Sequence, residues 1–131
     1  MESRIIVTNK EEVNTILIWD KNDTRIVKLN GFLIDNWNDY IVEISNLLDF
    51  PYEDSYGKDA YIDWMRDLSW FLEKYIIIII YNYDEFMKNS YSDKKEFLKM
   101  FEEDILPRWN GTMKIRIKDA TKKTVIVYLV E

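Results

Sequence analysis

Cysteine and histidine are both absent from this 131-residue sequence, and their absence excludes several classes of function. Without cysteine there is neither a disulfide framework nor a thiolate metal site. Without histidine there is no Ser-His triad, no HExxH zinc motif and no side chain that ordinarily titrates near neutral pH. An enzyme built from this sequence would have to use carboxylates, Lys, Tyr or Ser alone.

Glycine and proline are also scarce, with three and two residues respectively. Loops should therefore be short and few, and no repeat, low-complexity segment or Pro/Ser-rich linker marks a domain boundary. The hydrophobic and aromatic contents of 47% and 15% are typical of a folded chain. The length suits one domain with its own core, so we expect a single domain over residues 1–131.

Basic side chains are fewer than acidic ones, 18 against 24, which gives a net charge of −6. This balance argues against nucleic acid as a partner, because phosphate binding depends on Lys and Arg. It favours a basic protein partner. The longest apolar run, YIIIIIY at 75–81, is far shorter than the roughly 20 residues of a membrane span, and the N-terminus lacks a signal-peptide stretch. We therefore expect a cytoplasmic protein without membrane contact.

The order of the expected elements is that of an α/β protein. β-rich runs at 15–19 and 25–29 predict a hairpin or consecutive strands, preceded by a short strand at Ile5–Val7. The unbroken isoleucine run at 76–80 predicts a strand buried on both faces of a parallel sheet. Near the C-terminus, the pattern predicts a hairpin with its turn near 118–123.

Three long helices follow from apolar residues spaced three and four apart. They are expected at 37–48 after an Asp35 or Asn36 cap, at 59–74, and at 92–106 from a Ser92 cap to Pro107. The buried stripe of the second helix would contain Leu68, Phe71 and Leu72. A short helical turn is expected at Asp84–Met87.

The segment DFPYEDSYGKDAYIDWMRDL, residues 49–68, concentrates six acidic side chains against Lys58 and Arg66. Asp59, Asp63 and Asp67 recur every fourth residue, so a helix would place these like charges on one face, a mildly unfavourable arrangement. One explanation is a solvated polar face. Others are a Mg²⁺ or Ca²⁺ site, although no DxDxDG loop is present, and a glycosidase pair, whose carboxylates normally come from separate elements.

The same segment resembles the signature of the barstar family of ribonuclease inhibitors. That signature is a Pro, a Tyr-Gly pair, a polar residue or two, then Asp-Ala-x-x-Asp and a Leu-rich helix. Its places are filled by Pro51, Tyr56, Gly57, Asp59, Ala60, Asp63 and Leu68. RIVKLNGFLID, YIIIIIYN, EFLKMFEEDI and TVIVYLV also occur in the family's order. The resemblance covers about residues 25–131, with 1–24 as an N-terminal addition and 111–123 as an elaboration before the last strand.

The resemblance implies a barstar-like α/β fold, with a mainly parallel central sheet flanked by helices and with N-terminal and C-terminal strand additions. It also implies a non-enzymatic inhibitor without a cofactor, which blocks the basic active site of a ribonuclease or toxin with acidic side chains. The free protein would be a monomer that forms a heterodimer with its target. The expected partner-binding residues are Tyr52, Ser55, Tyr56, Gly57, Asp59, Ile62, Asp63, Asp67 and Glu103, with Asp63 as the anchor.

The sequence departs from the family pattern at two of these positions. Ser55 stands where the family has a further Tyr, with Tyr52 as the nearby substitute, and Ile62 fills an aromatic position of the helix. An alternative is therefore an immunity or binding protein on the same fold for a target other than a ribonuclease. A third hypothesis, a carboxylate-dependent hydrolase or metal-binding enzyme centred on Asp59 and Asp63, has no nucleophile motif to support it.

Overall fold

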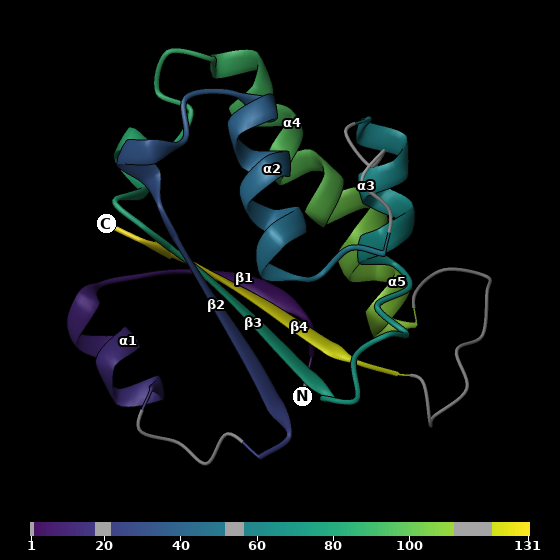
Figure 1. The fold of residues 1–131 in the computed structure, drawn as a ribbon. Helices are drawn as coiled ribbons and strands as arrows, with labels where there is room; N and C mark the ends of the chain where they lie inside the picture. The colour runs from purple at the N-terminus through teal and green to yellow at the C-terminus, as the bar shows by residue number, and fades with distance from the viewer. Residues whose placement is uncertain (1, 18–21, 52–56, 112–121) are drawn as a thin grey trace.

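The computed structural model in Figure 1 describes residues 2–17, 22–51, 57–111 and 122–131. Its strands are β1 (Arg4–Thr8), β2 (Thr24–Asn30), β3 (Tyr75–Tyr81) and β4 (Thr124–Val130). They form one sheet in the order β1-β4-β3-β2, and each neighbouring pair is parallel. The predicted mainly parallel sheet is therefore confirmed, with strands at 25–29, 76–80 and 125–130 in the predicted places.

The isoleucine run forms β3, between β4 and β2 in the sheet. Ile76, Ile78 and Ile80 are buried in the larger core on one face, whereas Ile77 and Ile79 are buried in a smaller core on the other. A strand that is covered on both faces needs no polar alternation, which explains the uninterrupted apolar sequence.

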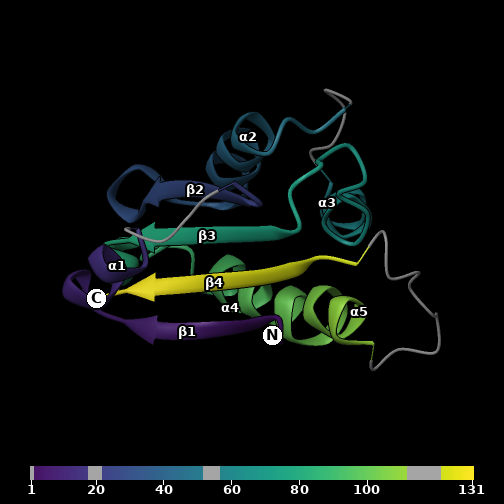
Figure 2. The same cartoon turned by 90° about the horizontal axis from the view of Figure 1, so that it is seen from below.

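Helices cover the sheet on both sides, as Figures 1 and 2 show. α1 (Lys10–Ile16) packs on the smaller core, and the larger core is covered by α2 (Trp37–Leu47), α3 (Lys58–Met65), α4 (Tyr91–Met100) and α5 (Leu106–Asn110). The chain crosses the sheet from β1 to β2 and then returns through β3 to β4. Because crossover connections between parallel strands are right-handed, the two directions place their helices on opposite faces.

The N-terminal region contains one correct and one wrong prediction. The short strand at Ile5–Val7 lies within β1, but Thr15 and Ile16 end helix α1 instead of starting a strand. The side chain of Asn9 caps this helix by accepting the Glu12 N–H at 3.0 Å, and acidic residues in the first turn suit the helix dipole. The rest of the predicted 15–19 strand, from residue 18, lies outside the described residues.

The predicted C-terminal hairpin is wrong, because β4 is paired on both edges. β1 occupies one edge of β4 and β3 occupies the other, so no further strand has room beside it. Residues 124–130 are instead an interior strand whose side chains are all buried. Most of the predicted turn lies outside the described residues.

The last long helix begins and ends elsewhere than predicted. Ser90 is its N-cap residue, and the chain stays helical beyond Pro107, through the π-helical turn η3 (Phe101–Ile105) and α5 to Asn110. Pro107 is in the first turn of α5, where a missing N–H is tolerated. Gly111, with φ of +71°, takes the left-handed conformation that ends the helix.

Two 3₁₀ turns, η1 (Gly31–Leu33) and η2 (Tyr83–Glu85), pack together where β2 and β3 end. A Cβ on Gly31 would lie 2.1 Å from the backbone oxygen of Asn82, so only glycine fits there.

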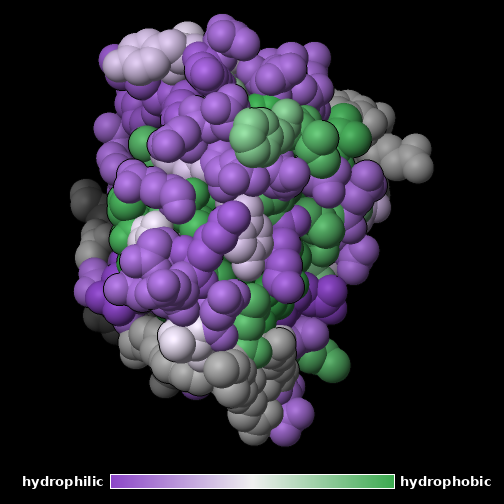
Figure 3. Space-filling model, turned by 90° about the vertical axis from the view of Figure 1, so that its left-hand side faces the viewer, coloured by the Kyte–Doolittle hydropathy of each residue, from purple (hydrophilic) through white to green (hydrophobic). Residues whose placement is uncertain are grey.

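Figure 3 faces the end of the molecule at which the strands finish. Hydrophilic side chains cover most of this face, with a hydrophobic patch toward the top right. No helix in the described ranges has the length and apolar character of a membrane span.

Candidate functional site

Helix α3 carries two of the three carboxylates that recur every fourth residue. It begins after Gly57, which has an extended backbone and no side chain that could cap the helix, and it runs from Lys58 to Met65. Asp59 and Asp63 lie one turn apart on this helix and are both exposed. Within the part of the chain that the structure describes, neither carboxylate forms an ion pair with a basic side chain. Their charges are therefore available to a partner.

The predicted extension of this helix to residue 74 is wrong. The helix ends at Met65 because side chains of α5 bind its last carbonyls: Trp109 Nε1 donates to Met65 O at 2.9 Å, and Arg108 Nε donates to Arg66 O at 3.4 Å. Leu68 then takes a left-handed backbone conformation with φ of +50°. Asp67 is exposed in the turn that follows the helix, so it does not extend the Asp59–Asp63 row.

The segment between α3 and β3 buries only part of the predicted stripe. Leu68 and Phe71 are buried, as expected, but Leu72 is 98% exposed. The ammonium group of Lys123 donates to the carbonyls of Phe71 and Glu73, on both sides of Leu72, and so fixes the non-helical path of this segment. Without helical geometry, the three-and-four spacing no longer directs Leu72 inward.

The underside of α3 fixes the direction of its acidic face. Tyr61 and Met65 are fully buried, and the hydroxyl of Tyr61 lies 2.6 Å from that of Tyr40 on α2. Burial raises the pKa of both hydroxyls, which keeps them neutral. Because Tyr61 faces the core, Asp59 and Asp63 are directed to solvent.

A shallow hollow of about 260 Å³ separates α3 from α4 and η3. Its lining residues are Lys58, Asp59, Ile62, Glu96, Lys99, Met100, Glu103 and Asp104. The structure therefore places Glu103 and half-buried Ile62 beside Asp59, on one side of the molecule. Four carboxylates face two ammonium groups around this hollow, so the negative surface extends from α3 to η3.

Lys58 is engaged with α4. Its Nζ lies 2.5 Å from Glu96 Oε2 and 3.6 Å from Asp93 Oδ1. The hydrogen bond that Lys58 donates to Glu96 raises the pKa of Lys58, with partial burial acting in the opposite direction. This cation, which is adjacent to Asp59 in the sequence, is thus directed to α4.

Among the described residues, no group of three or more His, Cys, Asp or Glu side chains is arranged to hold a metal ion.

α3 lies at the end of the sheet where the strands begin, as Figure 2 shows. Ligands of open α/β sheets usually bind beyond the opposite end, where the strands finish. The acidic surface of α3 is also exposed and shallow, unlike the enclosed pockets that hold small molecules. Its position and shape favour contact with a macromolecule.

Three of the predicted partner-binding residues, Tyr52, Ser55 and Tyr56, lie outside the described residues. Gly57 is described and exposed, and no atom of the described residues lies within 4 Å of the position that a Cβ would occupy. The described surface at the start of α3 therefore leaves room around Gly57.

A cluster of half-buried aromatic rings beside α3 was not predicted. The ring of Trp70 lies 5.9 Å from that of Phe50 and 5.6 Å from that of Trp64, and Trp70 Nε1 donates to Leu48 O at 2.8 Å. The signal that could have identified the cluster is the number of aromatic residues near Pro51, but their mutual contact depends on the turn after Met65.

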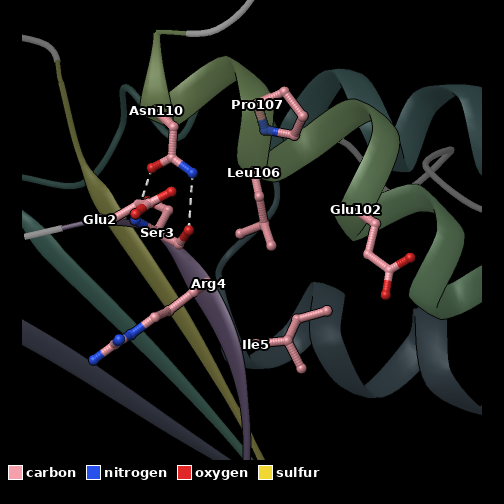
Figure 4. Close-up of a pocket in the computed structure, with 8 residues that line it drawn as sticks. All are labelled: Glu2, Ser3, Arg4, Ile5, Glu102, Leu106, Pro107 and Asn110. Carbon is pink, nitrogen blue, oxygen red and sulfur yellow. Dashed lines mark hydrogen bonds between the residues drawn. The ribbon is translucent and has the colours of Figure 1, made fainter.

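A second hollow lies between β1 and α5 and is drawn in Figure 4. At its edge the Asn110 side chain accepts the Ser3 N–H at 2.7 Å and donates to Ser3 O at 2.9 Å, while Ser3 Oγ accepts the Val125 N–H. These bonds attach the start of β1 to α5 and β4. They give the N-terminal addition a structural role at the edge of the sheet.

Comparison with known proteins identifies one family. The family model described as Barstar (barnase inhibitor) matches residues 24–126, from the first residue of β2 into β4. No curated protein and no solved structure matches the chain. The matched region contains β2, β3, the acidic helix α3 and the residues that line its hollow. Since that region is most of the sequence, this chain belongs to the barstar family.

Proposed function

We propose that this protein is an inhibitor that binds the basic active site of a ribonuclease toxin through α3, as an immunity protein or antitoxin in the cytoplasm. The observation that carries the proposal is the pair of exposed carboxylates, Asp59 and Asp63, which no described basic side chain neutralises. The family's description as barnase inhibitor supports it.

The electrostatics of the two surfaces support the same proposal. A ribonuclease active site is basic because its substrate is a polyanion, so a row of carboxylates complements it. Asp59 and Asp63 stand one turn apart, and Glu103 extends the negative surface across the hollow. An Arg or Lys from the ribonuclease would therefore be attracted by several carboxylates at once. Such a surface also accelerates association by steering.

In this proposal the remaining predicted residues surround the carboxylates. Gly57 and Ile62 would contact the ribonuclease beside Asp59, with Tyr52, Ser55 and Tyr56 contributing from the preceding segment and Asp67 from the turn after α3. The inhibitor would be a single domain and a monomer when free, and it would form a one-to-one heterodimer with its target. It would need no cofactor and would catalyse no reaction.

The test is inhibition of RNA cleavage by a panel of basic ribonucleases that includes barnase. Purified inhibitor is titrated into each enzyme at low salt, and the cleavage rate of a fluorogenic RNA is recorded. We expect at least one enzyme to lose its activity linearly up to one molar equivalent. Cleavage unchanged across the whole panel at a tenfold excess would refute the proposal.

A second candidate function is immunity to a toxin that is not a ribonuclease. It is favoured by the departures from the family pattern, because Ser55 and Ile62 replace aromatic residues that the family uses toward its target. The same titration against a panel of basic deoxyribonucleases separates the candidates. Inhibition of a deoxyribonuclease, without inhibition of any ribonuclease, would favour this alternative.

A further inference from the structure

We propose that Lys58 is a positioning residue that fixes the first turn of α3, and with it Asp59, in the orientation the partner binds. The inference rests on the proposed function and concerns a network formed by Lys58, Glu96, Asp93 and the Trp37 N–H, here called the Lys58 network. Lys58 is the basic residue of that turn. Its positive charge alone would weaken the binding of a basic partner, whereas the proposed positioning role would strengthen it.

The start of α3, before the buried Tyr61, has little else to hold it. α3 has eight residues, a length at which an isolated helix is unstable, and Gly57 provides no capping side chain. From Tyr61 onward, α3 is attached to the core by the buried side chains of Tyr61 and Met65 and to α5 by the Trp109 bond. Among the described residues at 57–60, only Lys58 forms a side-chain hydrogen bond or ion pair with another helix.

The Lys58 network joins the beginnings of three helices. Lys58 reaches from the first turn of α3 to Glu96 and Asp93 on α4. The second oxygen of Asp93 accepts the N–H of Trp37, the first residue of α2, at 2.9 Å. The Lys58 ammonium group also lies 5.7 Å from the centre of the Trp37 ring. Movement of the first turn of α3 would therefore break contacts with both neighbouring helices.

Asp59 follows Lys58 directly and lines the hollow opposite α4 and η3. Its distance from Glu103 across that hollow depends on the separation of α3 from α4, which the Lys58–Glu96 pair sets. Loss of the pair should release Asp59 first, whereas Asp63 is nearer to the buried Met65. Partner binding would then have to restore an orientation that the wild-type protein already has, at a cost in affinity.

The charge of Lys58 and its positioning role predict opposite results. If only charge mattered, Lys58→Met would strengthen binding of a basic partner and Glu96→Gln would weaken it. If positioning matters, both substitutions break the same pair and both should increase the dissociation rate constant. Lys99→Met is the matched control, because Lys99 lines the same hollow but forms no ion pair with any described residue.

The test measures hydrogen exchange in the free chain and dissociation from the ribonuclease that the panel identifies. The Tyr61 amide reports on the first turn, since it donates to Gly57 O at 3.0 Å, and the amide of Leu48, the C-cap residue of α2, is the internal reference. In Lys58→Met and Glu96→Gln we expect Tyr61 exchange and the dissociation rate constant to rise about tenfold each. Leu48 exchange and the melting temperature should be unchanged.

Lys58→Arg should keep the wild-type rates of Tyr61 exchange and of dissociation, because a guanidinium group can bind the carboxylates of both Glu96 and Asp93. Tyr61 exchange that is the same in Lys58→Met and Lys99→Met would overturn the inference, as would opposite changes of dissociation in Lys58→Met and Glu96→Gln. A panel without an inhibited ribonuclease would instead refute the proposed function. The exchange measurement does not depend on the partner, so the two failures are distinguishable.

Discussion

The hydroxyl of Tyr40 on α2 lies 2.6 Å from the hydroxyl of Tyr61 on α3, and neither side chain is exposed. This hydrogen bond joins two helices in the middle of an otherwise apolar core. It satisfies a polar atom on each side, which would be costly to bury alone. Tyr61 is also two residues after Asp59, so the bond sets the rotation of the acidic helix about its own axis.

The first prediction concerns the coupling of these two hydroxyls. Tyr61→Phe should lower the free energy of unfolding by about 1–3 kcal/mol, because it leaves the Tyr40 hydroxyl buried without a partner. The double variant Tyr40→Phe/Tyr61→Phe should lose less than the sum of the two single losses. Urea unfolding of the wild type, Tyr40→Phe, Tyr61→Phe and the double variant measures the three losses. A loss in the double variant equal to the sum of the two single losses would contradict the pairing.

The second prediction concerns alkaline pH. Burial raises the pKa of Tyr40 and Tyr61, and burial together with the charge of Glu102 raises the pKa of Tyr83 to about 12. In the unfolded chain tyrosine ionises near pH 10. The unfolded state therefore releases protons first, and the free energy of unfolding should fall as pH rises from about 10 to 12.

Urea unfolding at intervals between pH 9 and 12 measures this loss, with phenolate absorbance recorded in parallel. Tyr83→Phe is the control, because it should remove part of the decline while leaving the contribution of the Tyr40–Tyr61 pair. A free energy of unfolding that stays constant to pH 12 in both proteins would show that these hydroxyls are not protected by burial.

The third prediction compares two glycines. Gly31→Ala should destabilise the protein by about 3 kcal/mol, because the new Cβ would lie 2.1 Å from Asn82 O and the backbone of η2 would have to move. Gly57→Ala should change stability by less than about 1 kcal/mol, since its φ is −77° and no atom of the described residues lies within 4 Å of the new Cβ. Thermal unfolding of the two variants tests the contrast, and equal losses would contradict it.

Much of the fold could be predicted because its signals are local. The unbroken isoleucine run itself indicates a strand that is buried on both faces of the sheet. The side chain of Asn36 caps α2 by accepting the N–H of Asp39, three residues later. The early end of α3 could not be predicted in this way. It depends on Arg108 and Trp109, which are more than 40 residues away in the sequence and contact Met65 and Arg66 only in the folded chain.

The candidate site shows the same division. The spacing of Asp59 and Asp63 was sufficient to place both carboxylates on one helix. It was not sufficient for Asp67, because the helix ends before that residue. The Lys58 network was also beyond the sequence pattern, since Glu96 lies 38 residues after Lys58 and their pairing depends on how α3 packs against α4. Ion pairs between distant segments leave no periodic signal in the sequence.

The central claim is tested most directly by the effect of Asp63→Ala on inhibition of the ribonuclease that the panel identifies. We expect the binding free energy to weaken by about 2–5 kcal/mol, because a desolvated cation of the enzyme would lose its partner. Thermal unfolding should be unchanged. Asp84→Ala is the matched control, as it removes one exposed carboxylate from η2, at the end of the sheet where the strands finish. If Asp63→Ala inhibits as well as Asp84→Ala and the wild type, the acidic face of α3 is only solvated and the account is wrong.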